Sequence, residues 1–455
     1  MNEKINITFY GGAGSVTGAN FLIDDGSSKI VVDCGITQGE EWCDDCNFDE
    51  FAYAPQEVDA LIITHAHLDH IGRAPKLVRD GFKGPVYMTK PTKDLGEVML
   101  PDSERILARE AERRGIEKMY DTNDIDEFFA HVHTHDFHEP FEVGPYTVEF
   151  FIAGHVLGSA IVVLTHRETG KKIVFSGDLG NSPAPFLQSM EHIKDADYMI
   201  MESVYGDRTH EHKDEREEKF ARIVRESAER GGTLMIPAFS IERTQIMLYL
   251  LSNLMENGDI PKLSVFLDSP LAIKVTAIYA QWSRLFKEEV QGEVSKEGNI
   301  FDFSFLTKTE SVDESKAIDH EPDPKIVIAG AGMSHGGRIQ HHELHNLEDP
   351  KNTLLIVGYQ SPGSPGRLLL DGANKIRIFN KDVKVKATIE HITGFSAHAD
   401  HDDLFAFAQA SEKTLKKVFL AMGEPSAASF LAQRIHDFLG VTAIVPEKDA
   451  THTLE

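Results

Sequence analysis

A chain of 455 residues is longer than one ordinary hydrophobic core, so its length predicts two or three domains. The net charge of -27 excludes general, nonspecific attraction to a polyanion, although a metal-lined site with a few arginines can be positive locally. No apolar run is long enough to span a membrane, and Met1 to Tyr10 lacks the pattern of a signal peptide. We therefore expect a soluble, cytoplasmic protein without a membrane partner.

The cysteines argue against a disulfide framework, because there are only three of them, Cys34, Cys43 and Cys46. Reduced thiols are the simplest expectation. Cys43 and Cys46 have CxxC spacing, but their neighbourhood offers no second pair of ligands for a structural metal. Their role stays open.

The chain begins with short strands, predicted over residues 5–9, 21–23 and 29–33 and separated by glycine-containing turns. Asp33 ends the last of them. A carboxylate there can orient a ligand imidazole from outside the metal shell, whereas alone it would be an ordinary turn aspartate.

Three imidazoles and a carboxylate follow the apolar run 58–63, in the sequence His65-Ala66-His67-Leu68-Asp69-His70. A strand that breaks into a tight turn can direct His65 and His67 to one point while Asp69 and His70 face another. Zinc binds imidazole nitrogen and carboxylate oxygen, and two neighbouring zinc ions need two such sets. Buried imidazoles without partners are costly, so the cluster predicts a metal site rather than a polar strand end.

Two further strand ends carry metal-ligand side chains. His155 follows a strand predicted over residues 146–152, and Asp178 follows one over residues 172–175. The placement of Asp178, just past a buried strand, suits a carboxylate that bridges two metals. Histidines also alternate through residues 131–138, and there we expect an exposed strand whose histidines face solvent.

After Glu202 the pattern changes to helices that alternate with continuous apolar strands, which predicts a parallel sheet with crossover helices. Residues 287–324 show weak periodicity and are predicted as a surface excursion. Glycine-rich loops follow the predicted strands 325–328 and 353–357. Glycines between a strand and a helix start let backbone amides approach an anion, although each loop by itself could be a plain tight turn.

The motifs together resemble a known family. Asp33, HAHLDH, His155 and Asp178, in this order, resemble the metallo-β-lactamase superfamily. The further segments ESVYGDR, PAFSIERTQ, GAGMSHGGR, GYQSPGSPGR and GFSAHAD resemble its β-CASP branch of RNA-processing nucleases. The resemblance implies an α/β fold, with an αββα metallo-β-lactamase sandwich core over residues 1–205 and 378–455. An α/β insert with a parallel sheet, the β-CASP or lid domain, would cover residues 206–377.

The same resemblance assigns roles around two zinc ions. His65, His67 and His155 would bind one ion, Asp69 and His70 the other, and Asp178 would bridge them. The catalytic residues would be Asp69, Glu202 and His398, with Glu202 polarising His398 as the acid for the leaving oxygen. Asp33 would act from outside the shell. Substrate-binding residues would lie in the insert and would be Arg243, Ser334, His335, Gly336, Gly337, Arg338 and Arg367. Guanidinium groups suit phosphate oxygens, and the alternative for each arginine is an ordinary surface ion pair.

One position departs from the family pattern. RNA-type members have a histidine that completes the second zinc shell, in the motif resembling Phe419 to Glu424, and this chain has Met422 there. A thioether is a soft, weak ligand for zinc. We therefore expect a second zinc site that binds loosely or is missing. DNA-directed members also have an apolar residue at this motif.

These observations predict a zinc-dependent ribonuclease that hydrolyses single-stranded RNA with metal-activated hydroxide, in RNA processing or decay. Two alternatives are a DNA-directed phosphodiesterase of the same fold and a catalytically weakened nucleic-acid-binding subunit. The sequence leaves open whether cleavage is internal or proceeds from a 5′ end. The family often dimerises, so a homodimer is one candidate assembly.

Overall fold

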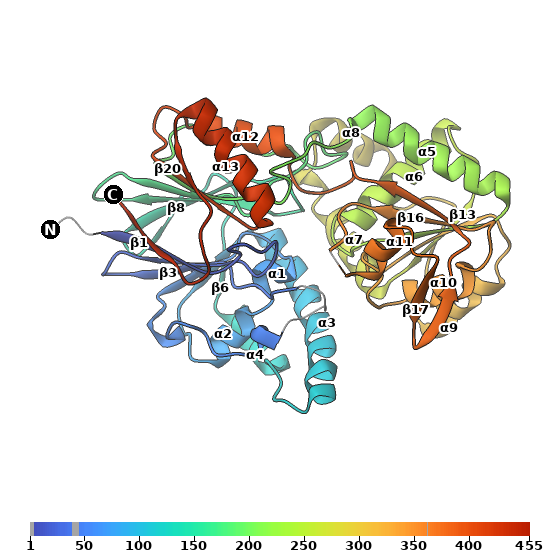
Figure 1. The fold of residues 1–455 in the computed structure, drawn as a ribbon, viewed down its shortest axis with the longest axis horizontal. Helices are drawn as coiled ribbons and strands as arrows, with labels where there is room; N and C mark the ends of the chain where they lie inside the picture. The colour runs from blue at the N-terminus through green and yellow to red at the C-terminus, as the bar shows by residue number, and fades with distance from the viewer. Residues whose placement is uncertain (1–3, 39–44, 362) are drawn as a thin grey trace. The chain divides into compact units, whose positions relative to one another are not determined.

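The computed structural model describes residues 4–38, 45–361 and 363–455. Within them the chain forms two compact units, and Figure 1 shows the elements of each. The first unit comprises the described residues up to Thr209 together with His398–Glu455, and the second comprises His210–Ala397. The extent 206–377 of the insert stays a prediction. The second unit extends further at its carboxyl end because β19 (Thr388–Ile392) pairs with β16 (Thr353–Val357).

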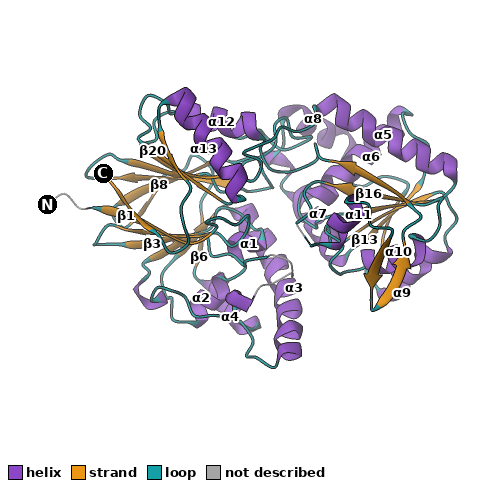
Figure 2. Ribbon diagram, viewed as in Figure 1, coloured by secondary structure: helices purple, strands orange, loops and turns teal. Residues whose placement is uncertain are grey.

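The first unit contains two sheets, each with seven strands among the described residues (Figure 2). One sheet has the order β22-β1-β2-β3-β4-β5-β6. Its strands are Thr451–Leu454, Ile5–Gly11, Asn20–Asp24, Lys29–Val32, Ala60–Ile62, Val86–Met88 and Val132–Thr134. The β22 to β3 pairs are antiparallel, and the β3 to β6 pairs are parallel.

The other sheet of this unit has the order β21-β20-β11-β10-β9-β8-β7. Its strands are Thr442–Ile444, Lys417–Ala421, Tyr198–Glu202, Lys172–Phe175, Ala160–His166, Tyr146–Ile152 and Phe141–Val143. Strand β20 comes from the end of the chain and pairs in parallel with β11, so residues far apart in sequence share one sheet.

The apolar side chains explain why the two sheets pack face to face. One buried cluster contains Phe9 and Phe21 of the first sheet together with Phe150 and Phe175 of the second. Alternate residues of the second sheet, such as Met199, face the other way and pack on helices. The helices of the unit are α1 (Leu68–Ile71), α2 (Ala74–Arg79), α3 (Lys90–Arg114), α4 (Thr122–Ala130), α12 (His401–Gln409) and α13 (Pro425–Leu439). With α2 and α4 on one sheet and α12 and α13 on the other, the predicted αββα sandwich is confirmed (Figure 1).

The second unit is built on a parallel sheet of six strands among the described residues, in the order β14-β13-β15-β12-β16-β19. Its strands not yet given are β14 (Leu306–Lys308), β13 (Ser264–Asp268), β15 (Lys325–Ala329) and β12 (Thr233–Pro237). The helices are α5 (Lys213–Arg230), α6 (Arg243–Asn257), α7 (Pro270–Gln281), α8 (Glu288–Glu297), α9 (Val312–Ala317), α10 (Ile339–Asn346) and α11 (Pro365–Leu370). A hairpin of β17 (Lys375–Ile378) and β18 (Lys381–Lys384) packs beside α10 and α11. The parallel sheet with crossover helices is as predicted.

The predicted surface excursion at residues 287–324 contains α8, β14 and α9. Strand β14 has three residues, which is too short for an alternation pattern to reveal.

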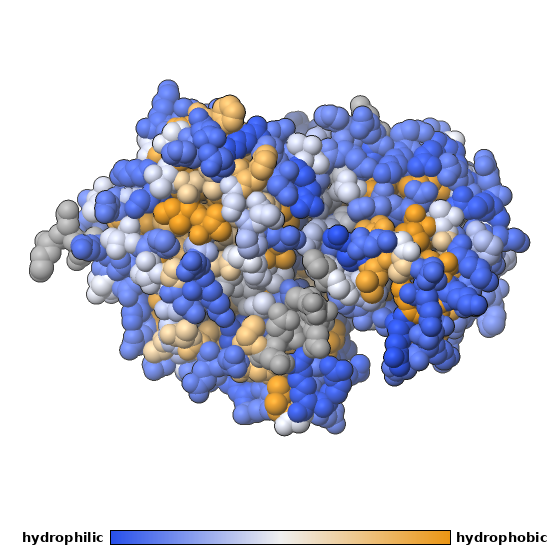
Figure 3. All heavy atoms as spheres, in the orientation of Figure 1, coloured by the Kyte–Doolittle hydropathy of each residue, from blue (hydrophilic) through white to orange (hydrophobic). Residues whose placement is uncertain are grey.

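Hydrophilic side chains cover most of the face drawn in Figure 3. In the described part of the chain no helix combines the length and apolarity needed to cross a membrane.

Candidate metal centre

The HAHLDH segment lies between the carboxyl end of β4, a strand of the first sheet, and the start of the short helix α1. His67 has extended backbone and stands directly before α1, so the chain turns between His67 and Asp69. A close backbone approach fixes this turn: a Cβ added to Gly35 would lie 1.6 Å from the carbonyl oxygen of Asp69. Glycine is therefore needed at position 35 for the two segments to touch.

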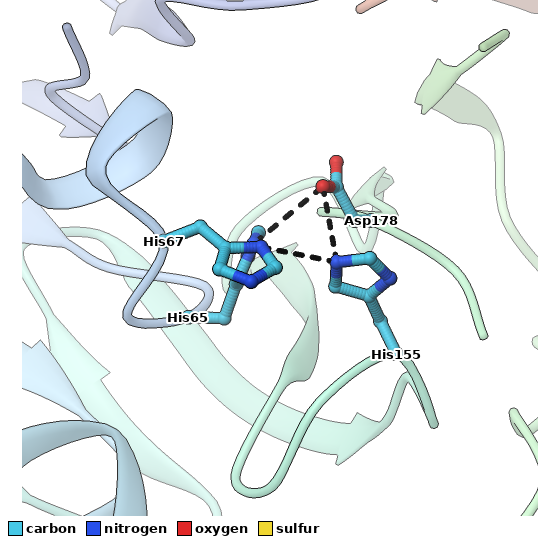
Figure 4. Close-up of side chains that lie close together, drawn as sticks. All are labelled: His65, His67, His155 and Asp178. Atoms are coloured by element: carbon cyan, nitrogen blue, oxygen red, sulfur yellow. Dashed lines mark hydrogen bonds and ion pairs between the residues drawn. The ribbon is translucent and has the colours of Figure 1, made fainter. Parts of the chain in front are cut away.

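Four side chains converge on one point (Figure 4). His65 Nε2 lies 3.1 Å from His67 Nδ1, and His155 Nε2 lies 3.2 Å from the same His67 atom. Asp178 Oδ2 lies 3.5 Å from His65 Nε2 and 3.5 Å from His155 Nε2. His155 and Asp178 each lie just beyond a strand of the second sheet, β8 and β10, as the sequence predicted.

This donor set fits a metal ion. Ligand atoms bound to zinc at about 2.0–2.1 Å in tetrahedral geometry lie roughly 3.3–3.4 Å apart, close to the spacing of these four atoms. Burial, followed by the proximity of His70, lowers the pKa of His65 well below its usual value, so its imidazole keeps a lone pair for a metal. A cation would give the three imidazole nitrogens and the carboxylate oxygen a common partner.

The second carboxylate oxygen of Asp178 faces a different histidine. Asp178 Oδ1 lies 3.2 Å from His70 Nε2, and Asp69 Oδ2 lies 3.9 Å from that nitrogen. Among the described residues, Asp178 Oδ1 and His70 Nε2 are both buried without a hydrogen-bond partner. Buried polar atoms are rarely left so, and a cation between them would satisfy both. The two oxygens of Asp178 thus face the two groups that the sequence predicted as separate metal sets.

Asp33 and Thr64 hold the histidines from behind. The His70 Nδ1–H group donates to Asp33 Oδ2 at 2.7 Å, and the Thr64 hydroxyl donates to the same carboxylate at 2.8 Å. Thr64 Oγ1 also lies 3.1 Å from His65 Nδ1. With their Nδ1 atoms held there, His65 and His70 present Nε2 to the site. Thr64 was missed in the sequence, because a hydroxyl between a strand and a motif carries no signal of its own.

Glu202 and His398 lie beside the Asp178 carboxylate. His398 Nδ1 is 3.2 Å from Glu202 Oε2 and 3.8 Å from Asp178 Oδ2. The Leu179 N–H group donates to Glu202 Oε1 at 2.6 Å, and Ala399 N–H donates to Leu179 O at 2.7 Å. These bonds fix the Glu202 carboxylate and the 396–400 loop to the Asp178 turn. Burial alone would lower the pKa of His398, but the charges of Glu202 and Asp178 raise it to about 9.

Met422 belongs to the apolar cluster between the two sheets. Its backbone N–H donates to Gly12 O at 2.6 Å, and a Cβ added to Gly12 would lie 2.6 Å from the Met422 sulfur. The thioether therefore packs against the Gly12 turn. The position after β20 is occupied in this chain by a side chain of the hydrophobic core.

The predicted substrate-binding residues lie in the second unit, at the carboxyl ends of its parallel strands. The Arg338 guanidinium donates from Nη1 to Asp268 Oδ1 at 2.6 Å and from Nη2 to the Glu310 carbonyl at 2.7 Å. Arg367 Nε donates to Asp371 at 3.0 Å. Arg243 is buried against Gly358, where an added Cβ would lie 3.2 Å from Arg243 Nη2. Each arginine has a contact of its own within this unit.

The two glycine-rich loops, residues 330–338 and 358–367, contact one another. Gln360 Nε2 donates to Gly332 O at 3.1 Å, and Gly366 N–H donates to Met333 O at 3.2 Å. Ser334 has a φ of 58° and its hydroxyl donates to the buried carboxyl of Glu343. The remaining predicted residues, His335, Gly336 and Gly337, complete the first of these loops. Asp268 and Glu343, which hold the loops, were missed because they lie in apolar or helical runs.

Comparisons with known proteins fit this architecture. Residues 22–204 match the metallo-beta-lactamase superfamily domain, residues 244–369 match the Beta-Casp domain, and residues 382–446 match the Zn-dependent metallo-hydrolase RNA specificity domain. Ribonuclease TTHA0252 of Thermus thermophilus is 36% identical over 425 residues, which cover 92% of this chain and 95% of that protein. The chain belongs to the β-CASP family of the metallo-β-lactamase superfamily.

Several further relatives of this β-CASP protein are archaeal. Transcription termination factor FttA of Methanocaldococcus jannaschii is 30% identical over 456 residues, covering 97% of this chain and 70% of the factor. FttA of Methanosarcina mazei is 29% identical over 455 residues, with the same coverage of 97% and 70%. A crystal structure of a protein of unknown function from Enterococcus faecalis V583 has a TM-score of 0.55 at 14% identity, over 99% of this chain and 100% of that one, and shows the shared fold.

Family membership makes the chain a metal-dependent hydrolase, as predicted. Cys34 and Cys46, the two cysteines in the described residues, are free thiols. Cys34 is buried, and burial raises the pKa of its thiol to about 12. Cys46 is partly exposed, and its predicted CxxC partner Cys43 lies outside the described residues.

Proposed function

We propose that this β-CASP hydrolase is a zinc-dependent ribonuclease that cleaves single-stranded RNA. The observation that carries the proposal is the position of Asp178, with one oxygen facing His65 and His155, the other facing His70, and the Glu202–His398 pair beside it. The ribonuclease relative and the match to an RNA specificity domain support RNA as the substrate and partner. The predicted cytoplasmic location and homodimer belong to this proposal as expectations.

The residues present fit two metal ions, and the two sites would bind them with unequal affinity. His65, His67, His155 and Asp178 would hold the first, while Asp69, His70 and Asp178 would hold the second. When bound, the ions supply an activated water and positive charge beside the scissile phosphate. The second set has fewer protein donors, since Met422 packs in the core, and we expect it to bind its ion more weakly.

The protein's own groups would carry the proton to the leaving oxygen. Water adds its oxygen to phosphorus while the bond from phosphorus to the leaving oxygen breaks, and that oxygen needs a proton. His398 is placed to give it, because Glu202 fixes the ring through Nδ1 and stabilises its charged form. Asp69, whose Oδ2 lies 3.9 Å from His70 Nε2, would orient the attacking water. In the second unit Arg243, Arg338, Arg367 and residues 334–337 would contact phosphates of the strand.

The experiment compares cleavage of one single-stranded sequence made as RNA and as DNA, in water labelled with oxygen-18. We expect cleavage of the RNA, with the label in the terminal phosphate and no 2′,3′-cyclic phosphate. An RNA carrying a single 2′-deoxynucleotide at the cut should still be cleaved, since water, and not the 2′-hydroxyl, attacks. Cleavage of DNA alone would contradict the proposal in favour of a DNA-directed enzyme.

Matched variants connect the activity to the site. His67→Ala should abolish cleavage and lower the zinc content per chain measured by mass spectrometry. His131→Ala, directly before β6 of the same sheet but outside the site, should change neither. RNA binding without hydrolysis by the zinc-loaded wild type would instead identify the weakened binding subunit. Two zinc ions retained firmly by the wild type would contradict the weak second site.

A further inference from the structure

The second unit has a topological switch point between β12 and β15. These strands are neighbours in the parallel sheet, but the chain leaves them in opposite directions. After β12 it passes through α6 to β13 on one side, and after β15 it passes through α10 to β16 on the other. In open parallel sheets, such a point leaves a crevice at the carboxyl ends of the strands, where ligands bind.

Phe239 lies at this point, in the loop that joins β12 to α6. Its side chain is 40% exposed, although most large apolar side chains of the unit are buried. The loop is held firmly, because the carbonyl of Phe239 accepts hydrogen bonds from Thr244 N–H at 3.3 Å and from the Thr244 hydroxyl at 2.8 Å. The ring is thus presented from a fixed backbone.

The ring lies against the backbone of Gly332, in the loop that follows β15. A Cβ added to Gly332 would come within 2.7–2.9 Å of three ring atoms of Phe239, so only glycine allows this approach. The Gly332 carbonyl in turn accepts from Gln360 Nε2 of the neighbouring loop. One side of the ring is therefore supported by backbone that two loops hold in place, while the rest remains accessible.

A rigid aromatic ring, supported on one side and exposed on the other, is suited to stack with a flat ligand. Bases of single-stranded nucleic acid stack on such rings, and the contribution does not depend on sequence because every base has a π face. An acidic protein gains from this mode in particular, since stacking needs no positive surface.

We propose that Phe239 is the stacking platform for one base of the single-stranded substrate. The assignment rests on the proposed function and adds a residue that reads the base rather than the phosphate. The second unit would then position the strand through an aromatic contact, in addition to any contacts of its arginines.

The test measures kcat and KM separately for wild type, Phe239→Ala, Phe239→Leu and Phe239→Trp on one single-stranded RNA. We expect KM to rise about tenfold in the alanine and leucine variants, with kcat changed far less, and to return toward the wild-type value in the tryptophan variant. Phe305→Ala is the matched control, because Phe305 is similarly exposed at 38% in the same unit but lies away from these loops, before β14. It should leave both constants unchanged.

A second measurement uses RNA with 2-aminopurine at successive positions, whose fluorescence falls when the base stacks. Quenching at one position in wild type that is lost in Phe239→Leu supports the platform. Equal KM values for wild type and Phe239→Leu, or equal losses in the leucine and tryptophan variants, would overturn it. If the wild type does not cleave RNA at all, the proposed function fails instead, so the two failures are distinct.

Discussion

In the metal centre, side chains from separate strand ends face one another at 3.1–3.5 Å, and two of the atoms have no hydrogen-bond partner among the described residues. In the glycine-rich loops of the second unit, the charged side chains of Arg338 and Arg367 already pair with carboxylates. Both regions lie at strand ends. The difference teaches that the first region is organised for a ligand it needs, and that the second uses much of its charge to hold its own loops.

The largest expected effect is on catalysis, in His398→Ala. We expect kcat for RNA to fall about 10²–10⁴-fold, because the leaving oxygen would lose the proton donor proposed above, while the zinc content per chain stays the same. Cleavage assays give kcat, and metal analysis of the same samples gives the zinc content per chain. Loss of zinc along with activity would show that His398 supports the metal and would break the distinction between ligand and acid.

Replacing Asp268 in the second unit should lower the stability of the protein and leave the metal centre unaffected. Its buried carboxylate is bonded to Arg338 and His342, at 2.6 and 2.7 Å. Asp268→Ala leaves these partners without their acceptor and should destabilise the protein by about 3–5 kcal/mol in denaturant unfolding. The metal affinity should not change. A variant as stable as wild type would show that the loop cations are available for other contacts.

The pH dependence of this effect follows from the pKa of Asp268. Burial alone would raise it, but hydrogen bonds from His342, Ser315, Thr309 and Arg338 hold it below the ordinary value of 3.8. A carboxylate with a lowered pKa contributes its stability above its unfolded pKa and loses it as the pH falls through the folded value. The stability difference between wild type and Asp268→Ala should therefore be full near neutral pH and shrink below about pH 4.

A smaller effect is expected behind the metal ligands, in Thr64→Val. Valine keeps the shape of threonine but removes the hydroxyl that bonds Asp33 and lies beside His65 Nδ1. Loss of such an outer partner costs about 10–100-fold in metal affinity. Competition with a chelator measures it. Thr414→Val, whose hydroxyl bonds the Ala196 carbonyl away from the metal set, is the matched control.

The sequence could predict that His65, His67, His155 and Asp178 come together, because each candidate ligand is signalled locally, by a polar residue at or just after the end of an apolar strand. His65 follows a strand of the first sheet, and His155 and Asp178 follow strands of the second. The αββα family pattern implied that these strand ends meet. The sequence could not predict which side chains hold the glycine-rich loops in place. The partner of Arg338 is Asp268, 70 residues away, and the sequence around either residue carries no signal of the pair. The role of β19 was missed likewise, since a strand does not state which sheet it joins.

The smallest expected effect is that of Arg367→Ala, and it tests whether the loops keep any cation for substrate. The pair with Asp371 is on the surface, with side chains 45% and 58% exposed, so its loss should change stability by no more than about 0.5 kcal/mol. If Arg367 contacts a phosphate of the bound strand, its removal should lower the slope of log Kd against log salt by about 1 for every RNA sequence. Asp371→Ala is the informative partner, because it frees the guanidinium and should strengthen RNA binding. Unchanged salt dependence in both variants would assign Arg367 to the loop alone.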